Sequence, residues 1–163
     1  MMDPFDAKPL NAAQLRRLKV FADMSEEQAS LFLDLVEPMQ VRPNRLIVKM
    51  DELGDCMYLL LDGEVRVSLS TEGRETILAK LETGDFFGEV CLFDEGCRSA
   101  DVISVRDTTL LRISKQAFQV LLEEYPKIAA LFLRAIIKTV AGRMRNTDQK
   151  YVDSMLLARF WNH

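Results

Sequence analysis

Hydrophobic residues recur with a helical period at both ends of the chain and with a period of two in between. Residues 11–36 place their apolar side chains at three- and four-residue steps, which predicts helix. Residues 25–28 (SEEQ) form a capping-box signature that would start a helix, and Pro38 is expected to end it. We therefore predict an N-terminal helical segment over residues 1–38.

Alternation begins at about residue 40 and is clear where Val65 and Val67 are separated by a polar residue. This pattern is typical of a strand that buries one face. Turn signals at Gly63 and Gly73 enclose this strand. Further strand-like runs cover residues 46–48, 57–61, 76–81, 101–105 and 109–113. Many short strands divided by turns predict an antiparallel barrel, sandwich or jelly roll over residues 39–113.

Helical spacing returns after Ser114, a residue type that favours the N-cap position. Pro126 then stands where a further helix can begin, since proline is favoured in the first turn. Residues 127–161 contain no proline and a single glycine, so they can form one helix of about 35 residues, roughly 50 Å long. We predict closing helices and a long C-terminal helix over residues 114–163, and one structural domain in all.

Composition and charge narrow the class of protein. The 163 residues are 48% hydrophobic and 28% charged, as in an ordinary globular domain. The net charge of −4 argues against wholesale binding to nucleic acid or to a membrane, and no apolar run reaches the roughly 20 residues of a membrane span. Three cysteines without a CxxC pair predict reduced thiols in the cytoplasm.

The histidine content argues against most catalytic classes that depend on histidine. The one histidine is His163, at the end of the chain, so His-dependent hydrolases and zinc sites are excluded. A metal-dependent enzyme on a jelly-roll barrel, such as a cupin, would need clustered histidines within the strands. We therefore predict no enzymatic activity and no metal site.

One segment, residues 84–102, carries residue types suited to an anionic ligand. A helical turn starting near Gly88 would present free backbone N–H groups to an anion. The guanidinium of Arg98 matches two phosphate oxygens, and the carboxylate of Glu89 suits a sugar hydroxyl. The pattern indicates a phosphorylated sugar compound. A plain surface ion pair between Glu89 and Arg98, stabilising by ~0–1 kcal/mol, is the alternative.

The order Phe87-Gly88-Glu89, then Leu92, then Arg98-Ser99-Ala100 closely resembles the phosphate-binding cassette of cyclic-nucleotide-binding domains. This family includes the bacterial catabolite activator, protein kinase A regulatory subunits and cyclic-nucleotide-gated channels. The resemblance covers nearly the whole chain. It implies a mainly β fold, an antiparallel β-roll or jelly roll (double-stranded β-helix), with N-terminal helices and a long C-terminal helix.

The resemblance also implies a role for each cassette residue. Arg98 would bind the equatorial oxygens of the cyclic phosphate, and Glu89 the ribose 2′-hydroxyl. Backbone amides and the Ser99 hydroxyl would complete the phosphate site. The residues expected to bind the ligand are Gly88, Glu89, Val90, Arg98, Ser99, Ala100, Thr147, Val65, Leu78 and Phe86.

Four of these residues are expected at the base rather than at the phosphate. Val65, Leu78 and Phe86 are candidates for an apolar wall, although each could equally belong to the core. On the long helix, Thr147 aligns with the adenine-contacting threonine of the bacterial members. Ser99 stands where cyclic-GMP-preferring members often carry threonine, so cyclic AMP is favoured over cyclic GMP.

Two corners depart from the family pattern. Where many members have glycine, this chain has Asn44 and Asp51. Both residue types tolerate the left-handed backbone conformation better than others, so we expect the turns to be kept.

The resemblance implies a regulatory sensor that acts through a protein partner or an appended domain. In the bacterial regulators a helix-turn-helix domain follows the long helix, whereas this chain ends at His163, so no direct DNA binding is expected of it. A stripe of small and apolar residues predicts a homodimer through the C-terminal helix. That stripe is Met144, Thr147, Tyr151, Ser154 and Ala158. A dimerisation scaffold of the same fold that binds no ligand is the alternative.

Overall fold

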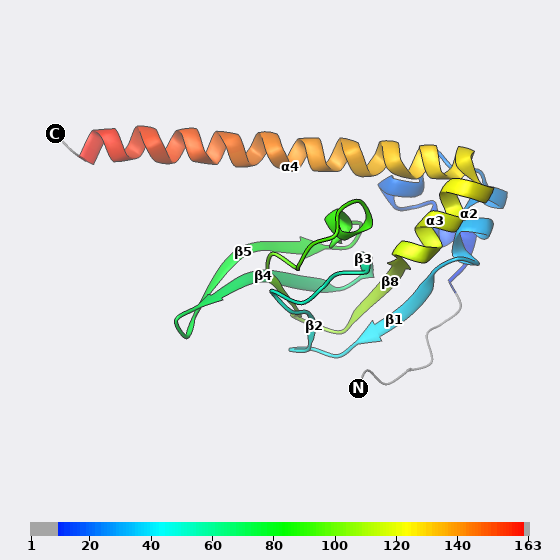
Figure 1. Ribbon diagram of the computed structural model, residues 1–163, viewed down its shortest axis with the longest axis horizontal. Helices are drawn as coiled ribbons and strands as arrows, with labels where there is room; N and C mark the ends of the chain where they lie inside the picture. Colours follow the sequence, from blue (N-terminus) through cyan, green and yellow to red (C-terminus); the bar gives the residue numbers. More distant parts are fainter. Residues whose placement is uncertain (1–9, 162–163) are drawn as a thin grey trace.

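Two four-stranded antiparallel sheets form a β-roll within the part of the chain that the computed structural model describes, the backbone of residues 10–161 and the side chains of residues 10–150 (Figure 1). One sheet has the strand order β1-β8-β3-β6, and the other has the order β2-β7-β4-β5. The strands are β1 Glu37–Val41, β2 Leu46–Val48, β3 Cys56–Asp62, β4 Glu64–Thr71, β5 Arg74–Glu82, β6 Phe86–Phe87, β7 Asp101–Ser104 and β8 Thr108–Ser114. The helices are α1 Ala12–Leu15, η1 Lys19–Phe21, α2 Glu26–Leu33, η2 Glu89–Leu92, α3 Lys115–Glu124 and α4 Pro126–Trp161.

The predicted N-terminal helical segment is divided into α1, η1 and α2. The capping box of α2 is present: the Ser25 hydroxyl accepts from the Gln28 N–H at 3.1 Å, and the Gln28 side chain accepts from the Ser25 N–H at 2.9 Å. Pro38 does not end this helix, and that prediction is wrong. It lies in β1 opposite Leu111, and β1 is an edge strand, where the missing N–H of proline is tolerated.

Each strand-like run of the sequence corresponds to a strand of the structure, namely β2, β3, β4, β5, β7 and β8. The pattern missed β1 and β6, because β1 contains a proline and β6 has only 2 residues. The two corners behave as expected: φ is 59° at Asn44 and 67° at Asp51, so both residues adopt the left-handed conformation.

Strand β3 separates two apolar clusters because its side chains alternate between its two faces. Met57 and Leu59 face a cluster formed with the helices. Cys56, Tyr58 and Leu60 face the interior of the β-roll. The alternation therefore places a thiol and a phenol inside the roll.

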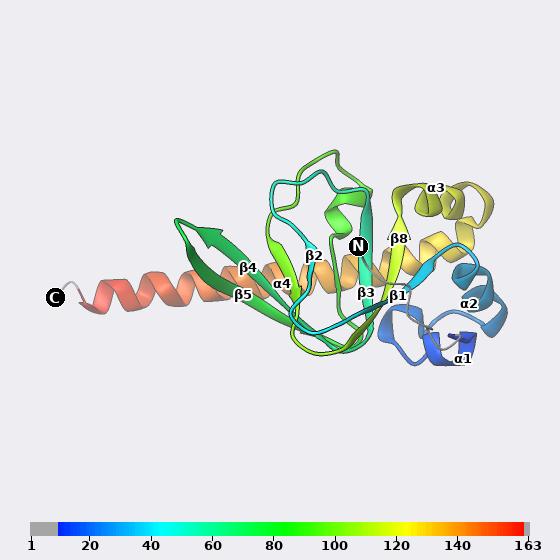
Figure 2. The ribbon, with the colours of Figure 1, turned by 90° about the horizontal axis from the view of Figure 1, so that it is seen from below.

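Helix α4 begins with Pro126 in its first turn and runs for 36 residues. Ile128, Phe132 and Ile136 bury its first half against the other helices. Its second half extends past the β-roll in the same direction as the β4–β5 hairpin (Figures 1 and 2). No helix in the described part of the chain is long and apolar enough to cross a membrane.

Candidate functional site

The segment after β5 is fixed to the core by two phenylalanines. Phe86 and Phe87 pair with Leu59 and Tyr58 of β3, and the rings of Phe87 and Tyr58 stack with their centroids 5.2 Å apart. Both phenylalanines are buried. The pair thus anchors the segment to the core, and the turn that follows is held against β3.

Gly88 begins the turn and is required there on two grounds. Its φ of 77° is the left-handed conformation, which costs other residues energy, and it forms the N-cap of η2. A Cβ at this position would also collide with the guanidinium of Arg98. The glycine therefore allows the arginine to lie directly against the backbone of the turn.

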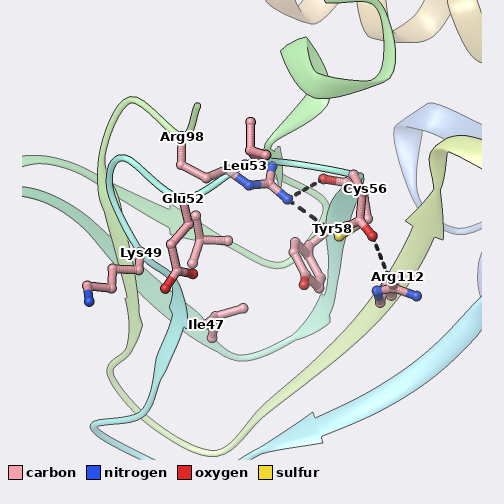
Figure 3. A pocket seen from close by; sticks show the side chains of 10 residues that line it. Ile47, Lys49, Glu52, Leu53, Cys56, Tyr58, Arg98 and Arg112 are labelled. Carbon is pink, nitrogen blue, oxygen red and sulfur yellow. Dashed lines mark hydrogen bonds and ion pairs between the residues drawn. The ribbon is translucent and has the colours of Figure 1, made fainter. Parts of the chain in front are cut away.

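Arg98 points inward, and its residue is only 8% exposed. Its Nη2 donates to the carbonyl of Cys56 at 2.7 Å, and Nη1 donates to the carbonyl of Gly88 at 3.3 Å. The same two nitrogens lie 3.4 Å from Sγ of Cys56 and 3.3 Å from Sγ of Cys91. Figure 3 shows the side chain of Arg98 reaching across to Cys56.

This buried cation has no acidic partner. Among the described residues, no carboxylate lies within ion-pair distance of Arg98, and its Nε–H has no hydrogen-bond partner. Every fully buried side-chain nitrogen of that part of the chain is satisfied, so the Nε edge must be reachable by solvent. Since burying an unpaired charge costs several kcal/mol, the arrangement suits an anion at the free edge of the guanidinium.

Glu89 pairs with a residue that the sequence analysis did not identify. Its Oε1 lies 3.6 Å from Nη1 of Arg143 on α4. None of the ion pairs among the described residues joins Glu89 to Arg98, so the alternative of a surface ion pair between these two is not found. Arg143 also donates from Nη2 to the carbonyl of Phe86 at 2.7 Å, and its guanidinium carbon lies 4.5 Å from the centroid of the Phe86 ring. Arg143 precedes Thr147 by one helical turn, so the two residues lie on the same face of α4. This spacing from a predicted ligand contact is the sequence signal by which Arg143 could have been identified as a site residue.

The other expected site residues lie at varied depths. Close to the cassette, Val90 is 63% exposed, Ser99 is exposed and Ala100 is buried. On α4, Thr147 is exposed, and its hydroxyl donates to the carbonyl of Arg143 at 3.0 Å.

The residues expected at the base are not brought together as one wall. Val65 is fully buried inside the β-roll, whereas Phe86 is fully buried in the helical cluster. Leu78, on β5, is 51% exposed. Val65 and Phe86 are therefore core residues on different faces, and Leu78 keeps a surface that a base could cover.

A cavity of about 160 Å³ lies beside Arg98 (Figure 3). Leu53, Cys56, Tyr58 and Arg112 are among the residues that line it. Burial raises the pKa of Tyr58 to about 12, and its hydrogen bond with the Cys56 side chain adds to the effect. The described residues contain no group of three or more side chains that could hold a metal ion.

Arg112 is held by two carboxylates at the edge of this cavity. Its Nη1 lies 3.1 Å from Glu37, and its Nη2 lies 3.5 Å from Asp55. Partial burial lowers the pKa of Arg112, but the contacts with Cys56 and Glu37 outweigh this and raise it above its ordinary value. Arg112 is therefore a permanent positive charge close to the Cys56 thiol.

Comparison with known proteins shows to which family the chain is similar. Residues 38–125 match the model of the cyclic nucleotide-binding domain. The "Cyclic AMP receptor protein" of Thermus thermophilus is 31% identical over 130 residues, covering 79% of this chain and 58% of that protein. A "cAMP-dependent protein kinase regulatory subunit" of Colletotrichum orbiculare is 29% identical over 122 residues, 75% of this chain and 31% of that protein.

A solved structure shares the arrangement of sheets and helices. The crystal structure of the catabolite activator protein of Thermus thermophilus superposes with a TM-score of 0.71 at 30% identity, covering 82% of this chain and 61% of that one. The chain thus spans less than two thirds of the length of each of these proteins.

Proposed function

The chain belongs to the cyclic nucleotide-binding domain family, and on that premise we propose that it is a regulatory module whose ligand is cyclic AMP. The observation that carries the proposal is Arg98, a buried guanidinium without a carboxylate partner in the described part of the chain. A cyclic phosphate supplies the negative charge that this arginine lacks. The nucleotide therefore stabilises a group whose burial is otherwise costly.

The cassette supplies the remaining polar contacts. The free Nε edge of Arg98 and the exposed Ser99 next to it take the phosphate oxygens. Glu89, with its side chain 16% exposed, accepts from the ribose 2′-hydroxyl while it stays close to Arg143. The sugar phosphate is thus bound by one charged group at each end.

The base faces α4 and the exposed side of β5. The Thr147 hydroxyl donates within its own helix, but its oxygen keeps lone pairs and can accept from the adenine 6-amino group. Leu78 offers an apolar surface for the ring. Together with the serine at position 99, these features favour adenine over guanine.

The signal passes through α4. Arg143 joins this helix to the ligand-binding carboxylate, so a ligand at Glu89 acts on the position of the helix. Exposed apolar residues on α4 and on β5, Ile137, Met144 and Ile77, support a homodimer through this surface. The side chains of Tyr151, Ser154 and Ala158, which the sequence analysis placed in the same stripe, lie outside the described residues.

A thermal-shift experiment tests the function directly. The full chain is heated with a panel of cyclic mononucleotides and cyclic dinucleotides, and a ligand at 100 times its Kd should stabilise it by about 2.7 kcal/mol. We expect the largest shift with cyclic AMP, a smaller one with cyclic GMP and none with 5′-AMP. If no nucleotide shifts the transition, the chain is a scaffold of this fold that binds no nucleotide.

A further inference from the structure

Two buried thiols lie on either side of the Arg98 guanidinium. Cys56 comes from β3 and Cys91 from η2, and their sulfur atoms lie 3.4 Å and 3.3 Å from the two terminal nitrogens of Arg98. Both cysteines are free, and they are 3% and 6% exposed. The guanidinium that we assign to the phosphate is therefore in direct contact with two oxidisable sulfur atoms.

Cys56 differs from Cys91 because it also lines the cavity of about 160 Å³ (Figure 3). The lining includes Leu53, which is 84% exposed, so the cavity reaches the surface. A water molecule needs roughly 10–15 Å³ of such volume. Hydrogen peroxide, which is little larger than water, can therefore reach the thiol of Cys56 without unfolding of the domain.

An oxygen atom added to Cys56 would meet a hydrogen-bond donor at once. Arg98 already donates toward this sulfur, and Arg112 and Tyr58 line the same cavity as Cys56. Charge-assisted hydrogen bonds from guanidinium groups to oxyanions are among the strong ones in proteins. An oxygen added to the sulfur within this cavity would thus lie near Arg98, and Arg112 lines the same cavity.

We propose that Cys56 is a peroxide-modifiable thiol whose oxidation weakens binding of the cyclic nucleotide at Arg98. The effect on binding rests on the function proposed above, whereas the modification does not. The oxygen of the sulfenic acid gives Arg98 a further hydrogen-bond acceptor inside the protein, and the cyclic phosphate then has to compete with it. A second effect in the same direction is that the added oxygen holds the guanidinium toward β3.

The reaction balances with peroxide as the oxidant. The Cys56 sulfur, as thiolate, attacks one oxygen of hydrogen peroxide, and the O–O bond breaks. A new S–O bond gives the sulfenic acid, and the second oxygen leaves as hydroxide, which takes up the thiol proton to form water. The sulfur loses two electrons and the peroxide gains them. A thiol reductant reverses the change.

The test uses the full chain, reduced and then treated with hydrogen peroxide in the presence of dimedone, a reagent that traps sulfenic acids. Peptide mass spectrometry should find the dimedone adduct on Cys56. Without dimedone, titration calorimetry should show cyclic AMP affinity lowered about tenfold by peroxide and restored by dithiothreitol. In Cys56→Ser and Cys56→Ala, the affinity for cyclic AMP after peroxide treatment should stay close to the affinity of the same variant in its reduced form, a ratio of about one.

Cys97→Ser is the matched control, because Cys97 is an exposed thiol, and the sulfur atoms that the guanidinium contacts are those of Cys56 and Cys91. It should respond to peroxide as the unaltered chain does. Absence of the adduct on Cys56, or an equal loss of affinity in both Cys56 variants, would overturn the proposal. If the reduced chain binds no cyclic nucleotide, the proposed function and the affinity effect both fail, and the adduct alone decides whether Cys56 is modified.

Discussion

Arg143 and Glu89 lie 3.6 Å apart, Nη1 to Oε1, and this ion pair joins the long C-terminal helix to the phosphate-binding cassette. The side chains are 35% and 16% exposed, so the pair is partly shielded from solvent. The same arginine donates to the carbonyl of Phe86, so α4 is attached both to the backbone and to the carboxylate of the cassette. A ligand that uses Glu89 must share it with Arg143, and we therefore expect ligand binding to be coupled to the helix.

Replacing Arg143 should loosen this attachment. We expect Arg143→Met to lower the free energy of unfolding by about 1–2 kcal/mol, since it removes a charged hydrogen bond to a backbone carbonyl. Cyclic AMP affinity should change as well. Arg145→Met, on the exposed part of the same helix, is the control. Chemical denaturation and calorimetry measure both quantities, and identical behaviour of the two variants would show that the ion pair has no such role.

Arg98→Lys should weaken binding of the cyclic nucleotide by more than about tenfold, or 1.4 kcal/mol. Lysine keeps the charge but cannot reproduce the planar fork that reaches the backbone and a phosphate oxygen together. Arg106→Lys, at an exposed ion pair with Asp62, provides the matched control and should bind normally. Unchanged affinity of Arg98→Lys by titration calorimetry would remove Arg98 from the phosphate site.

The role of Glu89 can be tested by removing the 2′-hydroxyl from the ligand and by replacing Glu89 in the protein. A hydrogen bond from the ribose to a carboxylate is worth about 1.5–3 kcal/mol, so 2′-deoxy cyclic AMP should bind at least about tenfold more weakly than cyclic AMP. In Glu89→Gln this difference should shrink, because the acceptor is no longer charged. Equal binding of the two ligands by the unaltered protein would contradict the assignment.

Shortening the chain to end after Arg143 should separate dimer formation from folding. Light scattering should find the full chain dimeric at tens of micromolar and the shortened chain monomeric. The shortened chain should also bind cyclic AMP more weakly, because Thr147 and the helical surface beyond it are lost. A monomeric full chain would refute the dimer, and unchanged affinity after shortening would refute the coupling.

Alkaline pH should destabilise the fold through Tyr58. Burial raises its pKa from 10.0 to about 12, so the unfolded chain loses the phenol proton at a lower pH than the folded protein does. The stability that this group contributes is fully present below pH 10 and is lost as the pH rises toward 12. Thermal unfolding followed by circular dichroism should show a steeper fall of Tm over this range for the unaltered protein than for Tyr58→Phe. Parallel curves would contradict the assignment.

Local chemistry in the sequence determined all the described strands except β1 and β6, the left-handed corners at Asn44 and Asp51, the extent of α4 and the resemblance of residues 84–102 to a phosphate-binding cassette. Each of these features depends on periodicity or on backbone preferences over a few adjacent residues. For the same reason the pattern failed at Pro38. Its helix-breaking preference is local, but its place in β1 depends on the edge of a sheet closed by β8.

Only the tertiary structure decided the partners of the site residues. The pairing of Glu89 with Arg143, and the position of Arg98 between the thiols of Cys56 and Cys91, join segments that are far apart in the chain or separated by a turn. Nothing in the local sequence specifies such contacts, since charged side chains pair with whatever the packing of β3, η2 and α4 brings within reach. The sequence determined which groups are available, and the packing decided that the guanidinium of Arg98 is buried with no carboxylate within ion-pair distance among the residues that the structure describes.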